Sequence, residues 1–208
     1  MILIGQYDSP FVRRVAIAMH LYGIPFEHRP WSTFGDGDKV AEFNPLRRVP
    51  TLVLDDGEAL IESTAILDYL DEFVGPSKAL IADRGRPRRE ALRICALGTG
   101  LGDKAVSLFY ERALHKETSE TWVNRCRTQI DAVLRALEAE RSKRTTSYWF
   151  GDTMSHADIA VACALRFTSE AHAGTIDVTK WSSLAAHAAR CEATQPFSSI
   201  YQQFIPPA

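Results

Sequence analysis

A strand that turns directly into a helix within the first dozen residues limits the fold to a few architectures. Residues 1–4 form a short apolar run of the kind found in buried strands. From Val12 onward apolar residues recur at helical spacing, and Pro10 stands where the first turn of a helix tolerates proline. Ser9 is therefore a candidate N-cap, with its hydroxyl at the positive end of a helix dipole. This hydroxyl either caps the helix alone or also contacts an anion bound there.

The alternation of strand and helix continues to about residue 75. After the first helix, the patterns predict a strand over residues 26–30, one helical turn over 39–43, strands over 51–54 and 59–61 around an Asp-Gly turn, and a helix over 62–74. The first two strands are joined by a helix and should be parallel, whereas the last two are joined by a tight turn and should be antiparallel. This order predicts a thioredoxin-like domain, a mixed four-stranded sheet with helices packed against it.

The rest of the chain shows helical patterns only, the longest over about 88–114 and 117–141. Glycine, proline and charged residues between positions 77 and 87 indicate a linker. The predicted organisation is therefore an α+β domain over residues 1–76, the linker, and an all-α domain over 88–208. Three glycines inside the first long helix indicate close packing, a bend or the approach of a ligand: Gly98, Gly100 and Gly102.

Local signals in the second half indicate a buried helical core. Ser155 and Asp158 form a capping box ahead of a helix that is apolar all round over residues 159–167. The four cysteines stand in apolar helical contexts without a CxxC pair, which predicts small buried thiols.

The charge balance gives no strong attraction to nucleic acid or to a membrane surface. The net charge is −2, with 6 Lys and Arg against 12 Asp and Glu in residues 1–75, and 18 against 14 in residues 76–208. Neither nucleic acid nor a membrane surface is indicated as a partner. The chain opens without a basic-then-apolar leader and has no uncharged apolar run near the roughly 18 residues of a membrane span, so we expect a cytoplasmic protein. The six histidines lack metal-ligand spacing, and we expect no metal.

Four segments together resemble the cytosolic glutathione S-transferases, in particular bacterial members of the serine type. They are S-P-F-V-R-R-V at 9–15, N-P-L-R-R-V-P-T-L at 44–52, E-S-T-A-I at 62–66 and S-H-A-D-I-A at 155–160. Each segment is weak alone, but the four in this order and spacing are specific for the fold. The resemblance implies an enzyme that binds glutathione on its first domain and a hydrophobic electrophile between the domains.

The resemblance also assigns the glutathione-binding residues. Val49 and Pro50 match a valine and a cis-proline whose backbone pairs with the cysteinyl part of glutathione, although Pro50 could simply begin a strand. Glu62 would take the ligand's ammonium group and Ser63 its γ-glutamyl carboxylate, unless Ser63 is only an N-cap. Arg48 would either reach the glycyl carboxylate or remain a solvated surface residue.

Ser9 matches the serine that such enzymes aim at the glutathione sulfur. A hydroxyl hydrogen bond and the helix dipole would stabilise the thiolate, which attacks the electrophile. Tyr7 is the alternative, because other branches of the family use a tyrosine near the end of the first strand. Neither position is a cysteine, which disfavours disulfide chemistry.

The resemblance implies a detoxifying transferase and a homodimer. Residues 97–110 and the aromatic tail over 196–208 would line the second pocket. Arg13 and Arg14 should be structural, pairing with acids of the other domain or of a second subunit. The alternatives are a glutathione-dependent isomerase or dehalogenase of the same fold, and a non-catalytic binding module.

Overall fold

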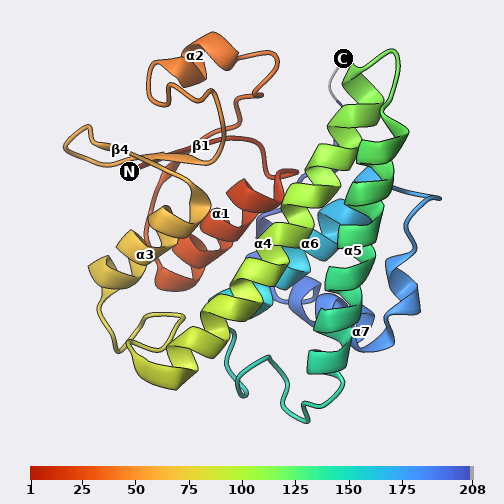
Figure 1. Ribbon diagram of the computed structural model, residues 1–208. Coiled ribbons are helices and arrows are strands. Elements are labelled where there is room, and N and C mark those ends of the chain that lie inside the picture. The colour runs from red at the N-terminus through yellow and green to blue at the C-terminus, as the bar shows by residue number, and fades with distance from the viewer. Residues whose placement is uncertain (207–208) are drawn as a thin grey trace.

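The computed structural model describes residues 1–206, which form a sheet-containing part followed by a helical part (Figure 1). The strands are β1 (Ile2–Ile4), β2 (Glu27–Arg29), β3 (Thr51–Val53) and β4 (Ala59–Ile61). The helices are α1 (Pro10–Tyr22), α2 (Gly37–Ala41), α3 (Ser63–Val74), α4 (Gly85–Leu114), α5 (Glu120–Arg141), α6 (His156–Ala171), α7 (Ser182–Glu192) and α8 (Gln195–Ser199), with a 3₁₀ turn η1 (Val178–Lys180). The predicted thioredoxin-like sheet followed by an all-helical part is confirmed.

The strands pair in the order β2-β1-β3-β4. β1 and β2 are parallel, and β1–β3 and β3–β4 are antiparallel. Leu3 and Leu52 point from the sheet into the core that contains α1 and α3. Ile4 and Val53 point to the other face, where Val40 of α2 covers them. Both faces of the sheet are thus buried, although every strand has only three residues.

Two long helices begin at other residues than the sequence patterns predict. α4 begins at Gly85 rather than at Arg88, because Pro87 fits within the first turn, where no intrahelical N–H bond is lost. α5 begins at Glu120 rather than at Glu117, because Ser119 caps it by accepting a hydrogen bond from Trp122 N. The last three residues of the predicted linker therefore belong to α4.

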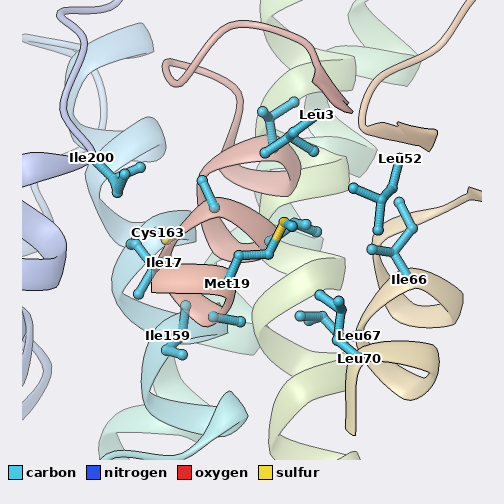
Figure 2. Packing of buried hydrophobic residues seen from close by; sticks show 14 of the residues in the cluster. Leu3, Ile17, Met19, Leu52, Ile66, Leu67, Leu70, Ile159, Cys163 and Ile200 are labelled. Carbon is cyan, nitrogen blue, oxygen red and sulfur yellow. The ribbon is translucent and has the colours of Figure 1, made fainter. Parts of the chain in front are cut away.

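Helix α1 joins the two parts of the molecule because it is buried on all sides. Val12 to Met19 are all buried. Figure 2 shows Ile17 beside Cys163 of α6, whereas the side chain of Met19 extends to the other side of α1, where α3 and the sheet lie. One apolar cluster thus runs from the sheet into the helical part. A polar cluster joins the parts as well. Tyr22 donates to Asp71 of α3, and Nε2 of His156 of α6 lies 3.0 Å from the same carboxylate.

The helical part is built on α4 and α6, which pack along much of their length (Figure 1). A Cβ atom at Gly98 would lie 3.0 Å from the Ala160 carbonyl carbon and 3.1 Å from Val161 N. The glycine thus allows close approach of α6, whereas Gly100 has open space around it. The predicted capping box at Ser155 and Asp158 is present, and the predicted buried cysteines are all buried and free.

Within the described residues, the tail packs against the rest of the molecule. Phe197 is fully buried, and Phe204 packs edge-on against Phe109 and Phe167. Residues 207–208 of the predicted tail lie outside the described part of the chain. No helix of residues 1–206 is both long enough and apolar enough to cross a membrane.

The glycines of α4 give a matched pair of stability predictions. We expect Gly98→Ala to lower the free energy of unfolding by about 1–3 kcal/mol, because the added methyl group presses on the backbone of α6. We expect Gly100→Ala to raise it by up to about 1 kcal/mol, because only helix propensity changes. Urea unfolding of both variants measures the difference, and equal effects would contradict the assigned packing.

Candidate functional site

The first part of the candidate site is the start of α1. Ser9 has extended backbone angles (φ −66°, ψ 124°), and its Oγ accepts a hydrogen bond from Val12 N at 3.4 Å. Ser9 is therefore the N-cap predicted from the sequence, and its side chain is only partly buried. Pro10 occupies the first helical position, as expected. A partly exposed hydroxyl thus stands at the positive end of a 13-residue helix.

Gly5 brings the loop before β3 against this turn. Its φ is +127°, and a Cβ atom there would lie 2.5 Å from Val12 Cγ2 and 2.8 Å from Val49 Cβ. Only glycine therefore fits between the end of β1, the start of α1 and Val49. The Val49–Pro50 peptide bond is cis, as the resemblance implies. The structure thus brings the predicted residues Ser9, Val49 and Pro50 into one region.

The start of α3 is the third part of the site. Glu62, not Ser63, is the N-cap residue, with φ +67° and no side-chain capping bond, so the reading of Ser63 as an N-cap is wrong. Ser63 is the first helical residue, and the carboxylate of Glu62 is exposed. A positive φ is costly for a residue with a side chain, and such strain is concentrated at functional sites.

Arg48 and Glu62 form an ion pair at the surface of this region. Arg48 Nη1 lies 3.3 Å from Glu62 Oε1, and both side chains are more than half exposed. An exposed ion pair of this kind contributes about 0–1 kcal/mol. A zwitterionic ligand could therefore replace it at little cost, pairing each side chain with its own opposite charge.

Tyr7 lies on the side of β1 that faces β2, opposite to β3 and β4. Its ring stacks on His28, with centroids 3.8 Å apart and planes 2° from parallel. His28 belongs to β2, which flanks β1 opposite to β3 and β4. Burial raises the pKa of the Tyr7 hydroxyl to about 12, which keeps it protonated at neutral pH.

The C-terminal tail crosses the same region, which the sequence patterns do not indicate. Tyr7 N donates to Gln202 Oε1 at 3.1 Å, and Ile205 N donates to Asp8 Oδ2 at 3.3 Å. Burial raises the pKa of the Asp8 carboxyl. Asp8, next to Ser9 in the chain, is thus a site neighbour that sequence reasoning missed.

Helix α4 borders the start of α1. A Cβ atom at Gly102 would lie 3.4 Å from Pro10 Cγ and 3.5 Å from Phe11 Cζ. Farther along α4, the ring of Tyr110 packs edge-on against Phe34, with centroids 5.3 Å apart. This part of α4 is the one expected to line a second pocket, which stays a prediction. A cavity of about 270 Å³ opens elsewhere, between α6, η1 and α7.

The two neighbouring arginines of α1 behave differently. Arg13 makes the predicted ion pair with an acid of the helical part, with Nη1 and Nη2 2.5 and 2.7 Å from the carboxylate oxygens of Glu192. Arg14 does not pair with any acidic group within residues 1–206 of its own chain, so pairing with an acid of a second subunit stays a prediction. It extends toward α3, where Nη1 donates to Ser63 Oγ at 3.4 Å.

A Cys-His-Asp cluster in the helical part is not a nucleophilic site. Cys191 Sγ lies 3.7 Å from His187 Nε2, which lies 3.5 Å from Asp158 Oδ1. All three side chains are fully buried, and burial raises the pKa of the Cys191 thiol far above its usual range. Among residues 1–206, no group of three or more His, Cys, Asp or Glu side chains is arranged to hold a metal ion.

Comparison with known proteins identifies this arrangement of domains. Residues 3–78 match the N-terminal domain of glutathione S-transferases, and residues 120–190 match their C-terminal domain. The chain is 33% identical over 166 residues to the uncharacterised GST-like protein YibF of Escherichia coli K12, covering 79% of this chain and 80% of that protein. The chain belongs to the glutathione S-transferase family.

Two further relatives bear on the chemistry of the family. A probable maleylacetoacetate isomerase 2 of Drosophila melanogaster is 32% identical, over 76% of this chain and 69% of that protein. A glutathione S-transferase of Methylobacterium radiotolerans, solved in complex with glutathione sulfonate, superposes with a TM-score of 0.89 at 27% identity, covering 100% of this chain and 98% of that chain. One relative is thus named as a probable isomerase. A transferase with nearly the same fold was solved with a derivative of glutathione bound.

The exposed ion pair gives a prediction about stability. We expect Arg48→Ala to change the free energy of unfolding by less than about 0.5 kcal/mol, because both partners are solvated. Chemical denaturation of the variant and of the wild type measures this change. A loss of several kcal/mol without ligand would contradict the assignment of Arg48 as a solvated residue.

Proposed function

We propose that the protein is a glutathione transferase that binds glutathione where the starts of α1 and α3 meet the Val49–Pro50 loop. The observation that carries this proposal is the convergence of three features: the Ser9 hydroxyl, the cis-proline loop and the exposed Glu62 carboxylate beside Ser63. The resemblance to a fold solved with glutathione sulfonate supports it.

Each ligand group has a chemically matching partner. The backbone of Val49 would pair with the cysteinyl unit as a neighbouring strand does. The N–H of Ser63, at the start of a 12-residue helix, suits the γ-glutamyl carboxylate, and Glu62 suits the ammonium group. Arg48 would release Glu62 and take the glycyl carboxylate.

Ser9 would hold the sulfur as a thiolate. A free thiol has a pKa near 8.5, so lowering it by two units requires about 2.7 kcal/mol. A hydrogen bond to a charged acceptor contributes roughly 1.5–3 kcal/mol, and the dipole of α1 adds to it. One hydroxyl in this position is therefore sufficient in magnitude. The thiolate would then attack an electrophilic carbon of a hydrophobic substrate near α4.

Tyr7 is the weaker candidate for this role. Its ring is engaged with His28 on the β2 side of β1, away from β3 and α3. A serine-type mechanism is therefore favoured over a tyrosine-type one.

An isomerase is the second candidate, because two relatives carry that name: the Drosophila protein and a maleylacetoacetate isomerase of Pseudomonas aeruginosa. Both reactions would use the same bound thiolate. Incubation with glutathione and either maleylacetoacetate or a panel of aryl and alkyl halides separates them, since isomerisation regenerates free glutathione whereas conjugation consumes it. Failure of the protein to bind glutathione in calorimetry would exclude both.

Replacing the two hydroxyl groups tests the mechanism. We expect Ser9→Ala to lower the rate at neutral pH by about tenfold to a hundredfold, because the pKa of bound glutathione rises by one to two units. Tyr7→Phe should change the rate less than twofold. Steady-state rates and a spectroscopic pH titration of the bound thiol measure both.

The control is Ser119→Ala, which removes the N-cap of α5 in the same geometry, 3.4 Å from Trp122 N. It should cost about 1 kcal/mol of stability, as Ser9→Ala does through its own cap, but leave the thiol titration unchanged. Full activity of Ser9→Ala together with inactive Tyr7→Phe would reverse the assignment.

We also propose a homodimer through the outer sides of α3 and α4. Arg88 of α4 pairs with Asp68 of α3 at 2.8 Å, so the two helices share one side of the molecule. Phe73 is 58% exposed and Leu92 40% exposed there. A two-fold axis would set the acidic α3 of one chain against the arginine-rich start of α4 of the other.

The dimer is tested by Leu92→Asp. We expect this change to raise the dimer dissociation constant at least about tenfold, because it places an unpaired charge in an apolar contact. Trp122→Asp, at an exposed position of α5, should leave the dimer intact. Size-exclusion chromatography with light scattering distinguishes the outcomes, and dissociation by both changes would refute this interface.

The four free, buried cysteines are consistent with a reducing compartment, and we propose a cytoplasmic location and a role in detoxification of hydrophobic electrophiles.

A further inference from the structure

Arg14 is a buried cation beneath the start of α3. Its side chain is only 3% exposed. Nη1 donates to Ser63 Oγ at 3.4 Å, and Nε is buried without a hydrogen-bond partner in the described part of the chain. The neighbouring Arg13 is equally buried, but its guanidinium is held by Glu192 and by the Ile200 carbonyl oxygen.

Within residues 1–206, no carboxylate compensates the charge of Arg14. Among the described residues no acidic oxygen lies within 4.0 Å of it, and the groups near it include the uncharged thiols of Cys95 and Cys163. Burial lowers the pKa of the Arg14 guanidinium, which reflects the cost of keeping this charge away from water. A buried charge is normally paired, because an unpaired one is strongly destabilising.

The hydrogen bond to Ser63 determines what the serine hydroxyl does. Ser63 is buried, and its Oγ already accepts from Arg14. The arginine has no lone pair to accept a hydrogen bond in return. The hydroxyl hydrogen of Ser63 is therefore directed away from Arg14 and is available to donate, next to the free N–H groups that begin α3.

We propose that Arg14 is a positioning residue for anion recognition: it orients the Ser63 hydroxyl as a donor and is the buried counter-charge for a carboxylate bound at the start of α3. The inference rests on the proposed function, in which that carboxylate is the γ-glutamyl α-carboxylate of glutathione. The bound carboxylate then compensates the buried charge of Arg14, which residues 1–206 do not pair. This subsite selects a charged carboxylate over a neutral group of the same shape.

The test compares two ligands by isothermal titration calorimetry: glutathione, and glutathione whose γ-glutamyl α-carboxylate is a carboxamide. We expect the wild-type protein to prefer glutathione by about tenfold or more, as a charge-assisted hydrogen bond predicts. Arg14→Met should reduce this preference at least fivefold while changing the affinity for the carboxamide less than twofold. A merely structural role of Arg14 would instead weaken both ligands equally, and that result would overturn the inference.

Arg13→Met is the matched control, since it removes an equally buried but fully paired arginine of the same helix and should leave the preference unchanged. If Arg14→Met does not fold, Arg14→Lys and Ser63→Ala replace it. Because both act on one hydrogen bond, their effects on the preference should be non-additive in the double variant, and additive effects would overturn the inference. No binding of glutathione to the wild type would refute the proposed function itself, whereas binding with a preference insensitive to Arg14 refutes only this inference.

Discussion

The complete burial of helix α1 is the constraint on which the rest of the structure depends. Val12 to Met19 contact the sheet and α3 on one side and α6 on the other, in one apolar cluster (Figure 2). A helix of this kind cannot shift without opening both parts of the molecule, because protein interiors are close-packed. Its first turn, with Ser9, is therefore fixed relative to Val49 and to the start of α3. The candidate site is thus held by core packing, although its residues lie on loops and helix ends.

The features that sequence analysis predicted well depend on local chemistry. The Asp-Gly turn, the Ser9 N-cap and the Ser155–Asp158 capping box are each decided by a few neighbouring residues. The parallel direction of β1 and β2 and the antiparallel direction of β3 and β4 follow from their connections, a helix and a tight turn. The glycines of α4 were ambiguous in sequence, and only the position of α6 shows that Gly98 serves close packing whereas Gly100 does not.

Features that depend on distant partners could not be predicted. The side to which Tyr7 turns is decided by His28, 21 residues away in the chain. The different environments of Arg13 and Arg14 depend on Glu192, which reaches only one of them. The Arg48–Glu62 pair and the positive φ of Glu62 arise from the meeting of two loops. No periodicity or composition carries this information, because it concerns which surfaces come together.

The tail crosses the start of α1, and different parts of it serve folding stability and the surroundings of the candidate site. Residues up to Ile200 anchor the tail in the core. Beyond them, Gln202 and Ile205 form hydrogen bonds with Tyr7 and Asp8, and the ring of Phe204 packs on Phe109 and Phe167. Sequence drift after Ile200 therefore alters the surroundings of the site at small cost to folding. This segment is the part of the chain through which duplicated genes could diverge in substrate choice while inheriting an unchanged scaffold.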